Sequence, residues 1–365
     1  MRMHVVAVGA GVVGSAVALR LAQNGARVDL LDAGEPGAGT SSTSFAWIGA
    51  SAAALRDYRA LNVAGVDAYA RLQAELGPRP WLRRTGSLVW HTDPGRSAEL
   101  ASQVAALTDM GYEATLLDPE QALALEPSLR LAPGVEHVAF HADEGHADGR
   151  RMAAELAARA VDAGAELRIG AEVTGVDDGA VALATGERLV ADAVVLCTGR
   201  WTGSLSGVAM LDAAERGALP IGLLVTTGAA PDPVGRVVVA DDVMIRPGDD
   251  GGLLLHADEQ DRLVHPDDDP ASVADVAGKV LDAARQHVMF PEALGVTRAV
   301  VGLRALTADL LPAVGRLSDR TYVAVTHSGI TLAPALGDIV AAEVLGRGDE
   351  PLLAPFRPDR LTRRT

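Results

Sequence analysis

The sequence predicts an α/β protein that begins with a strand–turn–helix–strand unit. Residues 4–8 form a short apolar run, and the turn Gly9-Ala10-Gly11-Val12-Val13-Gly14 follows at once. Residues 13–24 then show the apolar spacing of a helix, which Gly25 closes. A second apolar run, residues 28–32, ends in the carboxylate of Asp32. Together these elements form the fingerprint of a Rossmann-like, dinucleotide-binding βαβ unit.

Each part of this fingerprint has a physical role. Gly9 permits the tight turn, Gly11 lets a pyrophosphate approach the backbone, and Gly14 lets helix and strand pack closely. The free N–H groups at the helix start, which include those of Val12 and Val13, are expected to hold the phosphates. Asp32 is expected to accept hydrogen bonds from the ribose hydroxyls of the adenosine. The motif alone does not distinguish FAD from NAD.

The segment after Asp32 is rich in small and hydroxyl-bearing residues. Thr40, Ser41 and Ser42 lie in the run Gly39-Thr40-Ser41-Ser42-Thr43-Ser44. Their hydroxyls and backbone N–H groups could bind a pyrophosphate or the edge of a flavin. The alternative is a polar linker that carries a helix N-cap. The residues by themselves leave both interpretations open.

Composition excludes several classes of protein. The chain has 365 residues, of which 48% are hydrophobic and 3% aromatic, so we expect one large or two moderate domains with cores of Ala, Val and Leu. The net charge of −16 and the lack of a Lys/Arg-rich run argue against a nucleic-acid partner. No uninterrupted apolar run has the length of a membrane span, and we expect a cytoplasmic protein.

The single cysteine, Cys197, cannot form an intrachain disulfide and lies in an apolar run, so we expect a buried, unreactive thiol. His4, His256 and His265 have no partners at metal-ligand spacing, and no metal site is predicted. A second Gly-x-Gly-x-x-Gly motif is absent from the sequence, so no separate NAD(P)H site is expected.

The remaining chain reads as alternating helices and strands. Asp148 is the expected N-cap of one of the helices. A loop is expected over residues 327–332, between the last strand and the last helix. The expected helices span residues 55–76, 98–110, 148–163, 273–288 and 334–345. The expected strands span residues 86–90, 166–169, 172–176, 181–184, 192–197, 220–227, 236–245, 252–256 and 322–326.

In their order and spacing these segments resemble the D-amino-acid oxidase superfamily, which includes glycine oxidase, sarcosine oxidase and D-amino-acid dehydrogenase. The matching segments are residues 9–14, Asp32, residues 39–41, the strand around Val173, and residues 194–201, 302–309 and 327–334. The resemblance implies noncovalent FAD in a glutathione-reductase-type fold. It implies a discontinuous FAD-binding domain (residues 1–78, 148–215 and 300–365) and an inserted, mainly antiparallel substrate-binding domain (residues 79–147 and 216–299).

The resemblance also assigns roles to individual residues. Val173 would contact the adenine through its backbone, Gly199 and Trp201 would lie near the pyrophosphate, and Gly329, Ile330, Thr331 and Leu332 would meet the pyrimidine side of the flavin. Backbone N–H groups there can stabilise the negative charge that gathers at N1 and C2=O on reduction. Sarcosine oxidases attach FAD through a cysteine near the segment that matches residues 302–304, and this chain has none there.

Two residues are candidates for work on the substrate. Arg304 matches the arginine that clamps the substrate carboxylate in amino-acid oxidases, although Ala305 replaces the usual proline. The alternative is a structural arginine paired with Asp309 or another acid. His327 is a candidate acid or base, and the alternative is that it only positions its loop. Lys279, the only lysine, is expected on the surface, so no lysine over the flavin is evident.

The function that the resemblance implies is oxidation of an amine or amino acid by hydride transfer to flavin N5. The resulting imine would hydrolyse, and oxygen or an electron carrier would reoxidise the flavin. Two alternatives remain: a flavin monooxygenase or NAD(P)H-linked flavoprotein, and a non-catalytic FAD-binding protein. A flavin hydroxylase should show a Gly-Asp pair near residues 327–330, which read His-Ser-Gly-Ile. The substrate and the oligomeric state have no readable signal.

Overall fold

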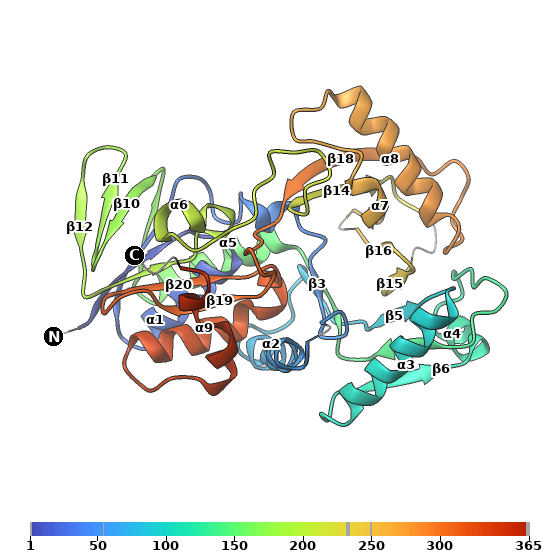
Figure 1. Ribbon diagram of the computed structural model, residues 1–365, viewed down its shortest axis with the longest axis horizontal. Helices are drawn as coiled ribbons and strands as arrows, with labels where there is room; N and C mark the ends of the chain where they lie inside the picture. The colour runs from blue at the N-terminus through green and yellow to red at the C-terminus, as the bar shows by residue number, and fades with distance from the viewer. Residues whose placement is uncertain (1, 54, 231–233, 249, 363–365) are drawn as a thin grey trace.

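The computed structural model describes residues 2–53, 55–230, 234–248 and 250–362. Figure 1 shows two parts side by side, one of which contains both ends of the chain. The helices are α1 (Val12–Gln23), α2 (Arg56–Leu76), α3 (Pro94–Thr108), α4 (Pro119–Leu125), α5 (Gly149–Asp162), α6 (Thr202–Ser206), α7 (Asp258–Asp261), α8 (Pro270–Ala284) and α9 (Gly329–Val344). Short 3₁₀ helices are η1 (Thr40–Thr43), η2 (Gly199–Trp201), η3 (Pro351–Phe356) and η4 (Pro358–Arg360).

The first sheet lies in the part that holds the termini. Its strand order is β19 (Ala313–Arg316), β20 (Thr321–Val325), β13 (Ala193–Leu196), β1 (His4–Val8), β2 (Arg27–Asp32) and β9 (Glu166–Ile169). Neighbouring strands are parallel from β20 to β9, and only the pairing of β19 with β20 is antiparallel in the described residues. All four residues of β13 are buried, as expected for a parallel strand covered on both faces.

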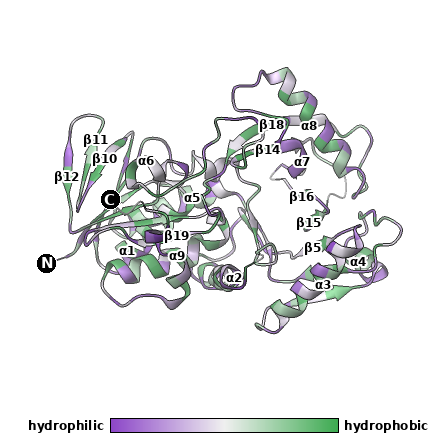
Figure 2. Cartoon of the chain, viewed as in Figure 1, coloured by the Kyte–Doolittle hydropathy of each residue, from purple (hydrophilic) through white to green (hydrophobic). Residues whose placement is uncertain are grey.

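Alternate residues of these strands belong to two different cores. Val5, Ala7 and Val195 pack under α1, α5 and α9. Val6, Val8 and Val194 pack on the opposite face, which an antiparallel sheet of β10 (Val173–Asp177), β11 (Ala180–Leu183) and β12 (Arg188–Val190) helps to cover. Figure 2 shows the green, hydrophobic segments gathered between these layers. This doubly covered parallel sheet confirms the predicted α/β class.

The second sheet makes up most of the other part of the molecule. Its order is β18 (Val296–Leu303), β14 (Ile221–Thr227), β17 (Leu253–Ala257), β16 (Val243–Pro247), β15 (Val237–Ala240), β5 (Ser87–Trp90), β7 (Val138–His141) and β6 (Ala114–Leu117). Among these described strands the pairing of β15 with β5 is parallel and the others are antiparallel. Helix α8 covers it through Val276, Ala277 and Val280. The expected mainly antiparallel sheet is therefore present.

A small sheet of β3 (Trp47–Ile48), β8 (Gly145–Ala147) and β4 (Leu82–Arg83) accompanies the two large sheets. Glu144, which precedes β8, is fully buried. Its carboxylate accepts hydrogen bonds from the Trp47 indole, the backbone N–H groups of Ala50 and Ser51, and the hydroxyls of Ser51, Ser87 and Tyr112. The Glu144 carboxylate thus holds the backbone of residues 47–51 in place, and through Ser87 it also holds β5.

Three sequence expectations need correction. Residues 236–245 form two strands, β15 and β16, because the chain turns at Asp241, whose φ is 51°. The last helix begins at Gly329 and not at residue 334, so residues 329–332 are its first turn. The strands β3, β4, β6, β7, β8, β12, β18 and β19 were not expected. Strand β18 runs across residue 300, where a domain boundary was expected.

Candidate cofactor and substrate site

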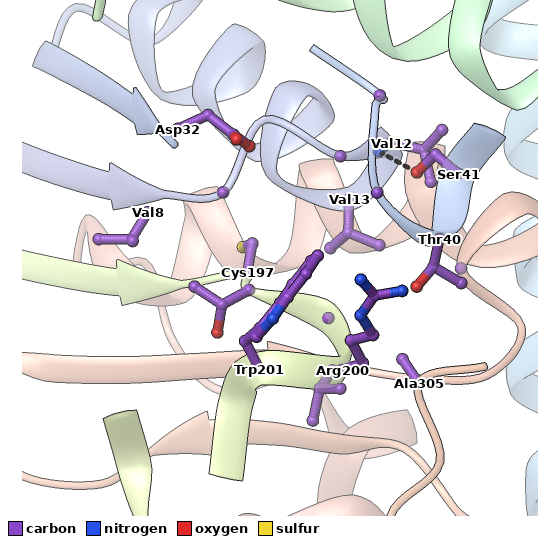
Figure 3. A pocket seen from close by; sticks show the side chains of 18 of the residues that line it. Val8, Val12, Val13, Asp32, Thr40, Ser41, Cys197, Arg200, Trp201 and Ala305 are labelled. Carbon is purple, nitrogen blue, oxygen red and sulfur yellow. Dashed lines mark hydrogen bonds between the residues drawn. The ribbon is translucent and has the colours of Figure 1, made fainter. Parts of the chain in front are cut away.

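A cavity of about 430 Å³ lies at the carboxyl ends of the parallel strands β1, β2 and β13. In open α/β sheets this edge is where ligands bind. The wall combines the turn after β1, the end of β2, η1, η2 and the first turn of α9. Figure 3 shows Asp32, Val13, Trp201, Arg200 and Thr40 around this space. We call it the cofactor cavity.

Two glycines of the turn have no room for a side chain. At Gly9, whose φ is 100°, a Cβ would lie 2.5 Å from the carbonyl oxygen of Cys197. At Gly14 it would lie 1.8 Å from the carbonyl oxygen of Gly9. At Gly11 a Cβ would have Oγ of Ser41 as its nearest neighbour, at 3.3 Å, because Gly11 faces the cavity. This geometry agrees with the tight turn expected at Gly9 and the close packing expected at Gly14, whereas the approach of a pyrophosphate to Gly11 stays a prediction.

Asp32 is held in place by the backbone at one end of the cavity. Its Oδ2 accepts the N–H of Ala10 at 2.6 Å, and its Oδ1 accepts that of Gly34 at 2.8 Å. Val173 and Glu172 line the cavity as well. Asp32 and Val173, which the sequence analysis assigned to the adenosine, thus line the same cavity, and their contact with an adenosine stays a prediction.

Most of the other predicted cofactor residues also line this cavity, namely Gly9, Gly11, Val12, Val13, Thr40, Ser41, Gly199, Trp201, Gly329 and Ile330. Ser41 Oγ accepts the N–H of Val12 at 3.2 Å, which holds η1 against the start of α1 (Figure 3). Thr40 donates to the carbonyl of Leu303 at 2.9 Å. The hydroxyl-rich segment is thus part of the wall.

Four predicted residues lie elsewhere. Gly14 packs behind the wall, and the Ser42 hydroxyl donates to the carbonyls of Ala38 and Gly39 within its own turn. Thr331 donates to the carbonyl of Trp47 at 3.2 Å and lines a neighbouring cavity. Leu332 is a fully buried core residue. A loop was expected over residues 329–332, but these residues form a helical turn. Side chains at successive positions of a helix point in different directions, so the four residues do not all line one cavity.

The start of α9 is held from outside the helix. Pro334 lies inside α9 and has no N–H to donate to the carbonyl of Ile330. The hydroxyl of Tyr69, on α2, donates to that carbonyl instead, at 2.5 Å. Tyr69 is fully buried, and burial raises the pKa of its phenol well above the usual value. The carbonyl of Ile330 therefore keeps a hydrogen-bond partner, while Gly329 and Ile330 line the cofactor cavity.

A second cavity, of about 470 Å³, adjoins the first; we call it the substrate cavity. Thr40, Ser44, His327 and Ile330 line both cavities. The rest of the wall comes from residues 43–53, α2, β14, β16, β17, β18 and the chain after them. The wall of the substrate cavity therefore combines residues of the second sheet with the N-terminal end of α9.

Arg304 lines the substrate cavity and is already heavily bonded. Its Nη1 donates to the carbonyls of Leu219 and Ile221, at 3.0 and 3.1 Å, and its Nη2 pairs with the buried carboxylate of Asp261. Asp309, the partner considered from the sequence, instead pairs with Arg360 at 2.7 Å. The structure thus supplies a different acid for Arg304.

His256, Asp258 and Asp261 surround this arginine, and their ligand atoms lie within 4.8 Å of one another. His256 Nδ1 lies 3.1 Å from the carbonyl of Leu223, and its Nε2 lies 2.9 Å from Asp258. Asp261 also accepts the N–H of Leu223 at 2.7 Å. The three residues lie within residues 256–261, so this spacing could be read from the sequence, and the expectation that His256 has no such partners needs correction. Since Arg304 already neutralises Asp261, the group forms the surroundings of that arginine.

His327 lies where the two cavities meet. Burial, together with the positive charges of Arg304 and His256, lowers the pKa of His327 to about 4. Its imidazole is therefore neutral at pH 7. A neutral imidazole can accept or donate a hydrogen bond at this position without adding charge.

Several site residues had no role in the sequence analysis. Tyr58 and Asn62 line the substrate cavity from α2, and the Tyr58 hydroxyl lies 2.6 Å from that of Ser328. They carry no motif, because a helix that lines a cavity looks like any amphipathic helix. Arg200 lines the cofactor cavity directly after Gly199. Its place at the carboxyl end of a parallel strand was the available signal.

Cys197 is buried as expected, and burial raises the pKa of its thiol to about 12. Lys279 lies on α8 with 54% of its side chain exposed.

Within residues 2–53, 55–230, 234–248 and 250–362, every helix is too short or too polar to cross a membrane.

Comparison with known proteins places these features in context. The model of a family described as FAD dependent oxidoreductase (DAO) matches residues 4–343. An uncharacterized oxidoreductase, YurR of Bacillus subtilis, is 26% identical, with 98% of this chain and 99% of that protein covered. Glycine oxidase of Bacillus licheniformis is 24% identical over 94% of each chain. The crystal structure of glycine oxidase from Geobacillus kaustophilus has a TM-score of 0.80 at 25% identity, covering 100% of this chain and 99% of that one.

Proposed function

This chain belongs to the DAO family of FAD dependent oxidoreductases, and from that premise we propose that it oxidises the C–N bond of a small amine or amino acid by direct hydride transfer. The family and its relatives establish an FAD-dependent enzyme that acts on amino or amine C–N groups. The substrate, the hydride step and the electron acceptor belong to the proposal. So do the domain boundaries and the cytoplasmic location expected from the sequence.

The residues of the cofactor cavity fit FAD. The cradle at Gly9, Gly11 and Gly14 and the start of α1 suit a pyrophosphate, and the oriented carboxylate of Asp32 suits a ribose. The start of α9 offers backbone N–H groups and the positive end of a helix dipole to the pyrimidine side of a flavin. Bound FAD supplies a two-electron acceptor; the chain supplies position and electrostatics.

One observation carries the proposal: His327, Thr40, Ser44 and Ile330 form walls of both cavities. A substrate in the second cavity would therefore lie against the end of the first that is nearest α9. There the C–H bond beside the nitrogen would break, the hydride with its two electrons would go to the two-electron acceptor, and the nitrogen would release a proton to solvent, which leaves an imine. Water then adds to the imine, which releases the amine or ammonia and leaves an aldehyde or keto acid.

We propose Arg304 as the anchor of a substrate carboxylate. A guanidinium presents N–H donors in a planar fork that suits a carboxylate. Asp261 and two carbonyls fix this fork within the wall of the substrate cavity. His327 would position the substrate nitrogen through a hydrogen bond, and its depressed pKa keeps it neutral for that task.

Relatives named glycine oxidase point to a small amino acid as the first compound to test. The purified yellow protein would be mixed anaerobically with glycine, N-methylglycine, D- and L-amino acids, L-proline and simple amines, and the flavin absorbance followed. We expect bleaching by at least one of them, and recovery on admission of air or of an artificial electron acceptor.

The rival functions give different results in the same experiment. Rapid bleaching by NADPH, with none by the amine panel, would favour a monooxygenase or an NAD(P)H-linked flavoprotein. A flavin that stays oxidised with every compound would favour a binding protein without activity. Either result would contradict the proposal.

A further inference from the structure

Arg200 is a charged residue of the cofactor cavity to which the proposed chemistry gives no role. It lies in η2, directly beyond β13, and its side chain lines the cavity. Among the described residues of that wall it is the only arginine or lysine, whereas Asp32 and Glu172 are acidic. A lone cation in the cavity of a protein with a net charge of −16 calls for an anionic partner.

The side chain is held so that it can meet a ligand. The guanidinium carbon lies 4.0 Å from the centroid of the Trp201 ring. That ring packs on Gly39, where a Cβ would approach it to 3.2 Å. Figure 3 shows the guanidinium between Trp201 and Thr40, with Val13 facing the same space. Stacking on an aromatic face leaves the N–H edges of a guanidinium available for an anion.

No carboxylate of the described residues forms an ion pair with Arg200 at a distance of 4.0 Å or less. Partial burial lowers the pKa of Arg200, but an arginine remains charged at neutral pH. A cation that is partly removed from water and has no acidic partner in the protein is suited to an anion of the ligand.

The position within the cavity indicates which anion. Asp32 and Val173 are the residues predicted to meet the adenosine, and Ile330 is predicted to meet the flavin; all three line this cavity. Figure 3 shows Arg200 beside Trp201 and Thr40, across the space from Val13 at the start of α1 and away from Asp32. The α1 dipole supplies the equivalent of about half a positive charge, whereas a pyrophosphate carries about two negative charges. We infer that Arg200 binds the pyrophosphate of FAD from the wall opposite α1 and so supplies the full positive charge that the glycine turn lacks.

The test measures ligand binding and does not depend on turnover. Apoprotein would be prepared from the holoprotein and titrated with FAD, with ADP, which carries the adenosine and the two phosphates but no flavin, and with riboflavin, which has no phosphate. For Arg200→Gln we expect the Kd of FAD and of ADP to rise about 10- to 100-fold, since a charge-assisted hydrogen bond to a phosphate is lost. The Kd of riboflavin should stay within about twofold.

Two comparisons make the result specific. Arg200→Lys should recover part of the affinity, because it keeps the charge and loses the fork. Arg298→Gln removes an exposed arginine of β18 and should leave all three Kd values unchanged. Added salt should weaken FAD binding more in the wild-type protein than in Arg200→Gln, because the variant has one charge pair fewer.

An unchanged Kd of FAD in Arg200→Gln would overturn the inference. Weaker riboflavin binding with unchanged ADP binding would also overturn it, because Arg200 would then act on the flavin ring. If Arg200→Gln does not fold, Arg200→Lys gives the same comparison between FAD and riboflavin. The inference concerns the cofactor alone, so it can hold even if every amine in the activity panel fails.

Discussion

The two cavities of this enzyme are built by different means. The cofactor cavity is formed largely by backbone and short side chains that follow strands of one parallel sheet: Gly9, Gly11, Asp32, Thr40 and Gly199. The substrate cavity is formed by longer side chains, such as those of Arg304, His327, Met244 and Tyr58, from elements far apart in sequence. The first depends on local conformation and the second on tertiary packing. Changes in each should therefore have separable effects on cofactor binding and on catalysis.

The largest effect is expected at the glycine turn. Gly14→Val places a Cβ 1.8 Å from the carbonyl oxygen of Gly9, so the turn after β1 must open. We expect loss of bound FAD and a decrease of about 3 kcal/mol or more in the free energy of unfolding. Flavin content after purification and urea unfolding measure these effects.

Gly34→Ala is the matched control, because Gly34 lines the same cavity but its nearest neighbours would lie 3.9 Å from a new Cβ. This variant should keep its flavin. Retention of FAD by Gly14→Val would contradict the contrast drawn between the two cavities, since the cofactor cavity would then not depend on the backbone turn.

The next effect concerns the substrate cavity. Arg304→Gln should lower kcat/KM for an amino acid about 100-fold or more, because the substrate loses a charge-assisted bond and Asp261 loses its partner. FAD content should be unchanged. Steady-state kinetics with an amino acid and with the matching decarboxylated amine separate the two contributions. An equal loss for both compounds would contradict carboxylate binding and leave Arg304 a structural role.

A smaller effect on both cavities is expected from the buried carboxylate behind residues 47–51. Glu144→Gln removes the charge that six donor groups share and introduces an N–H donor among them. We expect the free energy of unfolding to fall by about 2–3 kcal/mol and KM to rise. The Kd of FAD should change less than KM, since residues 47–51 line only the substrate cavity among the described residues. A variant with normal KM and weak FAD binding would contradict this order.

The smallest effect is expected from the titration of His327. Because its pKa is lowered to about 4, the folded protein binds no proton there between pH 5 and 8, whereas the unfolded chain does so below about pH 6.5. Its contribution to stability is therefore present above pH 6.5 and is lost as the pH falls toward 4. In the wild-type protein the rate of flavin reduction should show no inflection near pH 6.5. An inflection there that disappears in His327→Asn would contradict this expectation. Stopped-flow reduction of both proteins across this pH range tests the point.

The comparison also explains what could be predicted from the sequence. Strand β1, the glycine turn and Asp32 were placed correctly, because local spacing determines a βαβ unit. Strand β18 was not expected, since its residues are mostly exposed or partly buried and do not alternate strictly between buried and exposed positions. The partner of Arg304 was not found either. Asp261 lies 43 residues away from Arg304, on the short helix α7. The two residues meet because β14 pairs with both β17 and β18 while α7 contacts β14. Proline inside a helix misled the prediction of where α9 begins.

That proline has a wider consequence. The carbonyl that Pro334 leaves without a partner accepts the hydroxyl of Tyr69, a residue that lines neither cavity. One oxygen atom on α2 thus holds the helix end that would face the flavin ring. The position of this helix end therefore depends on the packing of α2, through a buried residue that is not among those lining either cavity.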